Sequence, residues 1–193
     1  MVKTSLTTII CLPEHIEKFF DNEISRIYKQ YGKTRLSGDA DGVYYNVPHI
    51  TLFSMGNCVK NKELISKKLD QILVKQEPIQ IKLKKLICFK RDKIAHVVVE
   101  VEKSKELQGL HESVYSELKD LVEPGDSFED EFVLNKFKPH LTIIASIPEK
   151  LCKQIKNKVV FESSKFMAIE VGIKLKEQGK KAKMYKTFKL EKS

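Results

Sequence analysis

One short pattern, written twice, constrains this chain more than any other feature. The stretches "NVPHITLFSM" and "NKFKPHLTIIAS" each place a His-x-Thr triplet, preceded by proline, at the start of an apolar run, and the two histidines, His49 and His140, lie 91 residues apart. Successive side chains of a β-strand point to opposite faces. His49 therefore shares a face with Thr51, and His140 shares a face with Thr142. Each strand is predicted to bury its aliphatic face and to present an imidazole and a hydroxyl together.

The pattern around the two triplets indicates alternating strands and helices. The segments with the alternation or apolar content of strands are residues 4–12, 46–55, 79–89, 94–102, 138–146, 167–176 and 184–191. The segments with the apolar spacing of amphipathic helices are residues 13–31, 64–73, 107–121 and 148–159. Polar loops rich in Gly, Asp or Glu precede both His-x-Thr strands, at residues 32–46 and 123–132.

These elements follow one order twice: strand, helix, loop, His-x-Thr strand, helix, strand. From the opening strand to the motif histidine the chain runs 40 residues in the first copy, counted from Ile9, and 42 in the second, counted from Val98. The sequence therefore predicts one domain, residues 1–193, of the α/β (α+β) class. Its two repeats, of about residues 4–90 and 94–191, are predicted to form lobes related by a pseudo-twofold axis, with both His-Thr pairs facing one cleft.

Two imidazoles facing each other across a cleft suit the cleavage of a phosphodiester bond. One imidazole can take a proton from the attacking hydroxyl or water while the other protonates the leaving oxygen, because histidine changes charge near neutral pH. The threonine hydroxyls can donate hydrogen bonds to the non-bridging phosphate oxygens, where negative charge grows in the transition state. Chemistry of this kind uses side chains alone and needs no metal.

Composition and charge narrow the class of partner. The hydrophobic content of 41% excludes a disordered chain, and the net charge of +9 favours a polyanion such as nucleic acid or an anionic membrane surface. From residue 165 to the end there are nine lysines and three glutamates, so this region carries most of the excess charge. The sequence has no run of about 18 apolar residues, as a membrane helix would need. We expect a soluble cytoplasmic or nuclear protein without a membrane partner.

The four cysteines are Cys11, Cys58, Cys88 and Cys152. They are far apart in the sequence and form no Cys-x-x-Cys pair, so their spacing indicates neither a zinc site nor a disulfide framework. We expect reduced core cysteines.

The motifs "PHIT" and "FKPHLT" resemble the paired H-x-[ST] motifs of the two-histidine (2H) phosphoesterase superfamily. Members include the LigT-type RNA 2′,3′-cyclic phosphodiesterases, the 2′,5′-phosphodiesterase domain of certain A-kinase anchoring proteins, and an exonuclease that trims spliceosomal RNA. The resemblance implies a bilobal fold with antiparallel sheets lining a central groove and helices outside. It also implies that His49, Thr51, His140 and Thr142 are catalytic, with no metal or other cofactor.

Four further residues are candidates for substrate binding. Single-stranded RNA is commonly held by aromatic side chains, and Tyr185 resembles an aromatic residue in the last strand of the family that lies near the nucleotide. Tyr45 competes for the same role, and Lys138 and Lys183 could contact phosphates. Lys174 and Lys176 alternate with aliphatic residues and either contact phosphates or form an ordinary solvated face.

Two other histidines lie in predicted elements. His111 falls on a predicted helix with no evident partner, so we expect it to face solvent or cap the helix. His96 shares a strand face with Val98, and we expect a structural role for it.

Two classes of function remain open. The first is a monomeric, metal-independent phosphodiesterase acting on RNA or oligonucleotides, which opens a 2′,3′-cyclic phosphate, cleaves 2′,5′-oligoadenylate or trims a 3′ RNA tail. The second is a catalytically silent protein that binds RNA ends in the same groove. Because both histidines and both threonines are present, the sequence favours the enzyme.

Overall fold

The structure is a computed structural model that describes residues 4–32, 48–56, 61–91, 94–122, 133–177 and 182–191. Its strands are β1 (Thr4–Ile10), β2 (Ile50–Ser54), β3 (Ile79–Arg91), β4 (Ile94–Val101), β5 (His140–Ile147), β6 (Ser164–Ala168), β7 (Glu170–Glu177) and β8 (Lys183–Lys189). Its helices are α1 (Glu14–Tyr31), α3 (Lys62–Leu73), α4 (Lys105–Leu118) and α6 (Glu149–Lys156), with short 3-10 turns η2 (Lys119–Leu121) and η3 (Leu134–Lys136). This is the mixed α/β class that the sequence predicts.

The strands form one antiparallel sheet of eight strands in the order β6-β3-β4-β5-β2-β1-β7-β8. The order is symmetric about the β5/β2 junction, because β4 and β1 occupy matching places, as do β3 and β7. The two halves of the sheet nevertheless do not coincide with the two sequence repeats. Strand β3 of the first repeat pairs with β4 of the second, and β7 of the second repeat pairs with β1 of the first. Each half of the sheet is therefore built from both repeats.

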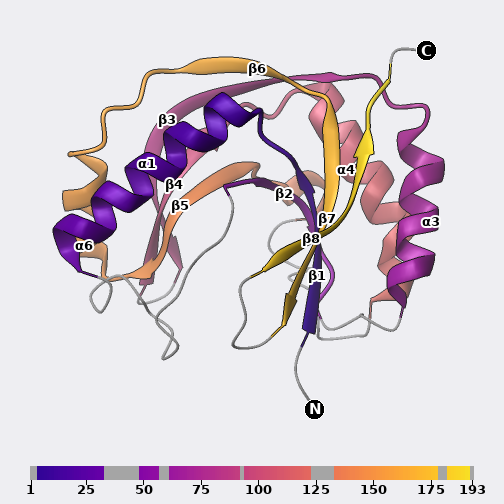
Figure 1. Cartoon of the computed structure of the whole chain (residues 1–193), viewed down its shortest axis with the longest axis horizontal. Helices are drawn as coiled ribbons and strands as arrows, with labels where there is room; N and C mark the ends of the chain where they lie inside the picture. The colour runs from indigo at the N-terminus through magenta and orange to yellow at the C-terminus, as the bar shows by residue number, and fades with distance from the viewer. Residues whose placement is uncertain are drawn as a thin grey trace.

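The predicted strand 167–176 is divided in the structure. It becomes β6 and β7, which are separated at Ile169, and β6 pairs with β3 while β7 pairs with β1. The two parts of one apolar run thus join opposite halves of the sheet. Figure 1 shows the chain passing along the top of the molecule from β6 into β7. The alternation of the sequence could not predict this division. Both parts are strands, and only one residue, Ile169, lies between them.

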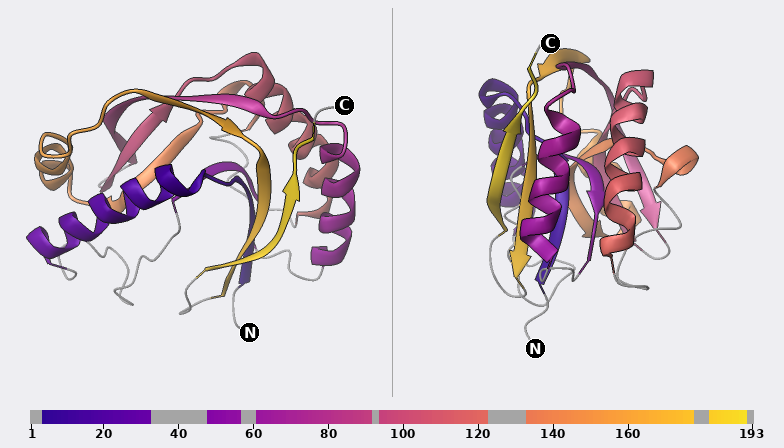
Figure 2. Two further views of the ribbon diagram at one scale, coloured as in Figure 1. Left: turned by 45° about the horizontal axis from the view of Figure 1, so that its top comes forward. Right: turned by 90° about the vertical axis from the view of Figure 1, so that its right-hand side faces the viewer.

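Helices pack beside both halves of the sheet. Helix α6 contacts β3 and β4, and α1 contacts β5, whereas α4 contacts β2 and α3 contacts β8. Figures 1 and 2 show α1 and α6 at one end of the molecule and α3 and α4 at the other. Each helix follows the amphipathic pattern of its sequence. Ser104 caps the N-terminus of α4, and its side-chain oxygen accepts a hydrogen bond of 3.2 Å from the Leu107 backbone N–H. The arrangement leaves the centre of the sheet to the two motif strands.

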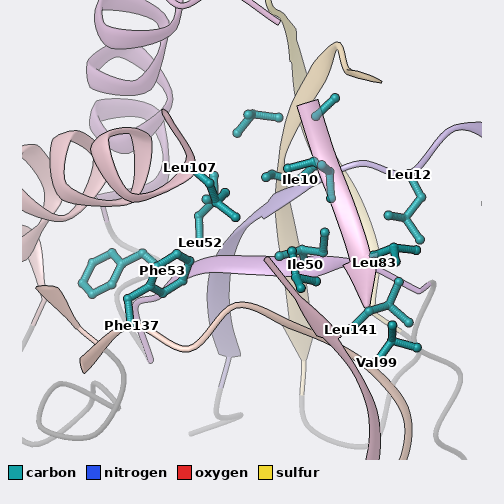
Figure 3. Close-up of a cluster of buried hydrophobic side chains, with 14 of the residues drawn as sticks. Ile10, Leu12, Ile50, Leu52, Phe53, Leu83, Val99, Leu107, Phe137 and Leu141 are labelled. Atoms are coloured by element: carbon teal, nitrogen blue, oxygen red, sulfur yellow. The ribbon is translucent and has the colours of Figure 1, made fainter. Parts of the chain in front are cut away.

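The hydrophobic core is continuous across the junction of the two halves. Ile50 of β2 pairs with Leu141 of β5, and both side chains are fully buried. Figure 3 shows Ile50 and Leu141 beside Val99, with Leu52 and Phe137 gathered near helix α4. Of these residues, Ile50, Leu52 and Leu141 are the aliphatic ones that alternate with the motif histidines and threonines. Their burial fixes which face of each motif strand points away from the core.

The cysteines depart from the expectation that all four are reduced. Cys88 of β3 and Cys152 of α6 form a disulfide, with their Cα atoms 6.0 Å apart. Cys11 is a free cysteine, and burial beside Glu170 and Glu17 raises the pKa of its thiol to about 12. Cys58 lies outside the described residues. The pairing follows from the packing of α6 on β3, which brings together residues 64 apart in sequence.

None of the helices in the described parts of the chain has the length and apolar character to cross a membrane.

Candidate active site

The register between β2 and β5 brings the two motifs face to face. Ile50 is paired with Leu141 in an antiparallel ladder, so the residues flanking this pair lie opposite each other across the strands. His49 then lies across from Thr142, and Thr51 lies across from His140. The four polar side chains occupy the face opposite to the buried aliphatic pair. The Ile50–Leu141 pair therefore lies at the centre of the symmetric strand order.

Both motif strands carry an irregularity directly after the motif threonine. On β2 the register with β1 shifts so that Leu52 is an extra residue, and on β5 the register with β4 shifts so that Ile143 is an extra residue. A bulge of this kind changes which face the following side chains occupy. As a result Ser54 and Ala145, three residues after each motif threonine, also line the site. The bulge thus recurs at the same place in both motif strands.

All four motif residues line one cavity of about 290 Å³. Strands of both halves contribute to its wall, together with Ile24 of α1. Its lining residues are Ser5, Thr7, Ile24, His49, Thr51, Leu52, Phe53, Ser54, Phe89, His96, Val133, Phe137, Lys138, His140, Thr142, Ile143, Ala145, Lys174, Lys176 and Ala182. The structure thus joins two motifs 91 residues apart into one site.

His140 is held by the backbone and by an aromatic ring. Its Nδ1 lies 2.8 Å from the carbonyl oxygen of Lys138, and because a carbonyl can only accept, Nδ1 carries the proton. The ring stacks on Phe89 with 5.6 Å between centroids and 11° between planes. Burial lowers the pKa of His140, although the hydrogen bond to Lys138 acts in the opposite direction. The lowered pKa favours the neutral imidazole, and the hydrogen bond to Lys138 sets its tautomer, with the proton on Nδ1.

His49 meets a different partner. Its Nδ1 lies 3.2 Å from the Nζ of Lys174 on β7, and only 6% of Lys174 is exposed. Burial, followed by the charge of nearby Lys176, lowers the pKa of Lys174 to about 8. The two motif histidines thus have equivalent places in the fold but unlike hydrogen-bond partners.

The two walls of the cavity differ in polarity. Strands β1 and β7 pair Thr7 with Lys174 and Ser5 with Lys176, and all four of these residues line the cavity. The other half of the sheet adds apolar and aromatic side chains, which are Phe89, Phe137, Ile143 and Ala145, beside the polar His96, Lys138, His140 and Thr142. One wall can bind anionic oxygens, and the other can contact the face of a ring.

The four proposed substrate-binding residues have different outcomes. Lys138 lines the cavity. Tyr185 does not line it, because its hydroxyl donates a 2.6 Å hydrogen bond to Glu63 of α3 and its ring lies beneath Lys62. Lys183 is exposed at the start of β8 and does not line the cavity, although the neighbouring Ala182 does. Tyr45 lies outside the described residues.

Sequence reasoning missed several lining residues. Ser5 and Thr7 alternate with buried residues on β1, which is a visible but weak signal. His96, for which a structural role was expected, also lines the cavity, and its Nδ1 accepts a 3.3 Å hydrogen bond from the Ser146 backbone N–H. Phe89 carries no sequence signal, since an aromatic residue in a strand is more often part of the core.

His111 differs most from its expectation, because it is fully buried rather than facing solvent. Its Nδ1 lies 2.8 Å from the carbonyl oxygen of Leu52, the extra residue of the first bulge. Its Nε2 accepts a 2.9 Å hydrogen bond from the Leu134 backbone N–H, just before the second motif, and its ring stacks on Phe137 at 4.0 Å. His111 therefore connects the bulge that follows the first motif with the turn that precedes the second motif.

The role of His111 predicts a pH-dependent stability. Burial lowers the pKa of His111 in the folded state, so the unfolded chain binds the proton more readily. The stabilising contribution is complete above the ordinary histidine pKa of about 6.5 and is lost as the pH falls toward the lowered folded value. We expect the free energy of unfolding, measured in urea at pH 7.5 and pH 5.5, to fall more for the wild type than for His111→Gln. Equal falls in both proteins would contradict this assignment.

Within the described residues there is no group of three or more His, Cys, Asp or Glu side chains that could hold a metal ion.

Comparison with known proteins adds independent information. The family model of the 2'-5' RNA ligase superfamily matches residues 15–174. No curated protein sequence matches the chain. Among solved structures, LigT of Escherichia coli complexed with NADP+ is similar at 14% identity with a TM-score of 0.62, covering 98% of this chain and 99% of that one. The protein TT0787 of Thermus thermophilus is similar at 14% identity with a TM-score of 0.65, covering 96% and 97%.

The family match covers most of the chain and includes both His-x-Thr motifs, while the structural likeness extends over nearly the whole fold. The chain therefore belongs to the 2'-5' RNA ligase superfamily, within the 2H phosphoesterases, and is a phosphodiesterase.

Proposed function

We propose that this RNA phosphodiesterase acts at the ends of RNA or oligonucleotides, where it opens a 2′,3′-cyclic phosphate or cleaves a 2′,5′-linkage. In this proposal His49, Thr51, His140 and Thr142 are the catalytic side chains. The observation that carries the proposal is that all four line one cavity, with each histidine across from the threonine of the other motif.

His140 is the general base. With its Nδ1–H donated to the Lys138 carbonyl, the lone pair lies on Nε2, and the lowered pKa favours the neutral ring. The base takes a proton from water, or from the hydroxyl that attacks phosphorus. His49 then protonates the oxygen that leaves. Stacking on Phe89 holds the base in one orientation, which preserves the alignment that proton transfer needs.

The two threonines act on the phosphate itself. A threonine hydroxyl is a hydrogen-bond donor, and Thr51 and Thr142 flank the two histidines from opposite strands. A phosphate placed between the histidines would bring one non-bridging oxygen toward each hydroxyl. Such donors stabilise the charge that accumulates on these oxygens in the transition state.

The size and polarity of the cavity support a terminal nucleotide as the group it holds. A volume of about 290 Å³ is at the lower end of the range for small-molecule sites. The hydroxyl and lysine wall can receive phosphate oxygens, and the apolar and aromatic side chains of the other wall can contact a base. Structures of Escherichia coli LigT with phosphate and with 3'-AMP support this assignment of a nucleotide phosphate to the site.

A substrate panel tests the proposal. Purified protein is incubated in EDTA with 2′,3′-cyclic-ended RNA, 2′,5′-oligoadenylate and 3′,5′-oligoadenylate, and the products are identified by mass spectrometry. We expect turnover of one of the first two substrates, and we expect it to survive chelation because every proposed catalytic group is a side chain. Shortening of the 3′,5′-linked strand would instead identify a 3′-trimming exonuclease.

Two results would contradict the proposal. Complete loss of activity in EDTA, restored by a divalent metal, would defeat the side-chain mechanism. Tight binding of all three substrates without any product would identify a silent RNA-end binding protein.

A further inference from the structure

Lys174 is the one lysine among the buried side chains of the described chain, and it lies in the cavity. Burying an ammonium group is costly unless a partner compensates its charge. No ion pair between described residues includes Lys174. Its polar contact is instead the Nδ1 of His49, at 3.2 Å. A buried lysine held against a catalytic candidate calls for a functional explanation.

Among the residues that the structure describes, no group around Lys174 carries the negative charge that would neutralise it. On its own strand Lys176 is a second cation, and from β1 the neighbours are Thr7 and Ser5, which do not titrate near neutral pH. Strand β8 contributes Met184 opposite Lys174. The other titratable groups of the cavity are His96, Lys138 and His140, none of which carries negative charge. The environment therefore favours release of a proton from Lys174.

We propose that Lys174 is the proton reservoir of His49, an inference that rests on the proposed function. The general acid is then a lysine-histidine relay rather than His49 alone. Lys174 acts through His49 and is a positioning and proton-supplying residue. The hydrogen bond from its ammonium to Nδ1 places the proton of neutral His49 on Nε2. The ring is thereby set to donate toward the leaving oxygen.

The relay conserves protons at each step. Water attacks phosphorus and gives its proton to Nε2 of His140, while the bond from phosphorus to the leaving oxygen breaks. That oxygen takes the proton from Nε2 of His49, and Nδ1 of His49 takes a proton from Lys174. The products of the step are an imidazolium at His140, a His49 protonated on Nδ1, and a neutral Lys174 amine. Solvent then carries the proton from His140 to Nε2 of His49, and the Nδ1 proton of His49 passes back to the Lys174 amine, which restores the starting state.

The relay also explains how both groups are ready at neutral pH. Two unperturbed imidazoles would be in the required combination of one neutral and one protonated ring in at most about a quarter of molecules. Here burial lowers the pKa of the base, His140, and places the pKa of the acid, Lys174, at about 8. The two values are moved apart in the order that catalysis needs.

Three variants of one position test the relay on the substrate identified by the panel above. Lys174→Met removes the proton source and leaves an imidazolium as the acid, so the alkaline limb of kcat/KM should move from about pH 8 toward the histidine range. We expect a loss on the order of tenfold at pH 8 and little loss at pH 6. Lys174→Arg keeps the charge and the hydrogen-bond donor but does not release a proton. Lys174→Arg should therefore lose activity across the pH range, and Lys174→Gln should follow Lys174→Met.

Matched controls separate this inference from the proposed function. Lys189→Met removes an exposed lysine of β8 outside the cavity and should leave the profile unchanged. A wild-type pH profile in Lys174→Arg would overturn the relay and reduce Lys174 to a source of positive charge. Activity retained in His49→Ala or His140→Ala would instead overturn the proposed function.

A second readout does not depend on turnover. Nitrogen-15 NMR of the histidine rings at pH 7 should place the proton of His49 on Nε2 in the wild type. A proton on Nδ1 would show that His49 donates to Lys174 and would overturn the relay. Thermal unfolding of each variant confirms that the fold is intact, and Lys174→Met is expected to fold because methionine fits a similar volume without a buried charge.

Discussion

Replacing either motif histidine by alanine is expected to lower kcat by about 10²- to 10⁴-fold, because each change removes one of the two proton-transfer groups. Substrate binding should largely persist in both variants, since the hydroxyls and lysines of the β1 and β7 wall remain in place. The double variant His49→Ala/His140→Ala should lose little more than the worse single variant, because the two histidines act in one transfer. Single-turnover rates on one substrate measure all three effects.

The matched control for these variants is His15→Ala, which removes an exposed histidine of α1 that does not line the cavity. It should retain wild-type activity. Near-full activity in either motif variant would show that the two repeats do not build one active site. Losses that multiply in the double variant would show that the histidines act in separate steps.

The positions of the motif residues could be predicted because the information is local. Alternation within a strand places His49 with Thr51 and His140 with Thr142, and the burial of Ile50 and Leu141 confirms which face is which. The repeated order of elements led to the second prediction, that the two His-Thr pairs face one cleft. Strand geometry and an internal duplication are therefore enough to predict the centre of the candidate site.

The exchange of strands between the repeats could not be predicted in this way. Strand β3 pairs with β4 of the second repeat, and strand β7 pairs with β1 of the first repeat. The sequence pattern of a strand does not specify which strand it pairs with. The division at Ile169 and the Cys88–Cys152 pairing have the same origin. Both depend on contacts between segments far apart in the sequence, which are settled by the packing of the whole sheet.

Polar residues outside the motifs were the hardest to assign. A lysine that alternates with aliphatic residues has the same pattern whether it faces solvent or a cavity. Lys174 faces the cavity that the two motifs form, whereas Tyr185 faces Glu63 of α3. His111 likewise follows the apolar face of its helix, so its burial was visible in the spacing although its partners were not.

The hydroxyls of the two motif threonines should contribute about 10²-fold each to kcat, with little effect on KM, because they act on charge that develops in the transition state. Thr51→Val and Thr142→Val remove the hydroxyl at nearly constant volume, whereas Thr51→Ser and Thr142→Ser keep it. We therefore expect the serine variants to remain within about threefold of the wild type and both valine variants to fall by about 10²-fold. Thr187→Val, at an exposed position of β8 outside the cavity, should have no effect. If the valine and serine variants of one threonine lose the same amount, its hydroxyl does not contact the phosphate, and the loss reflects packing of the methyl group instead.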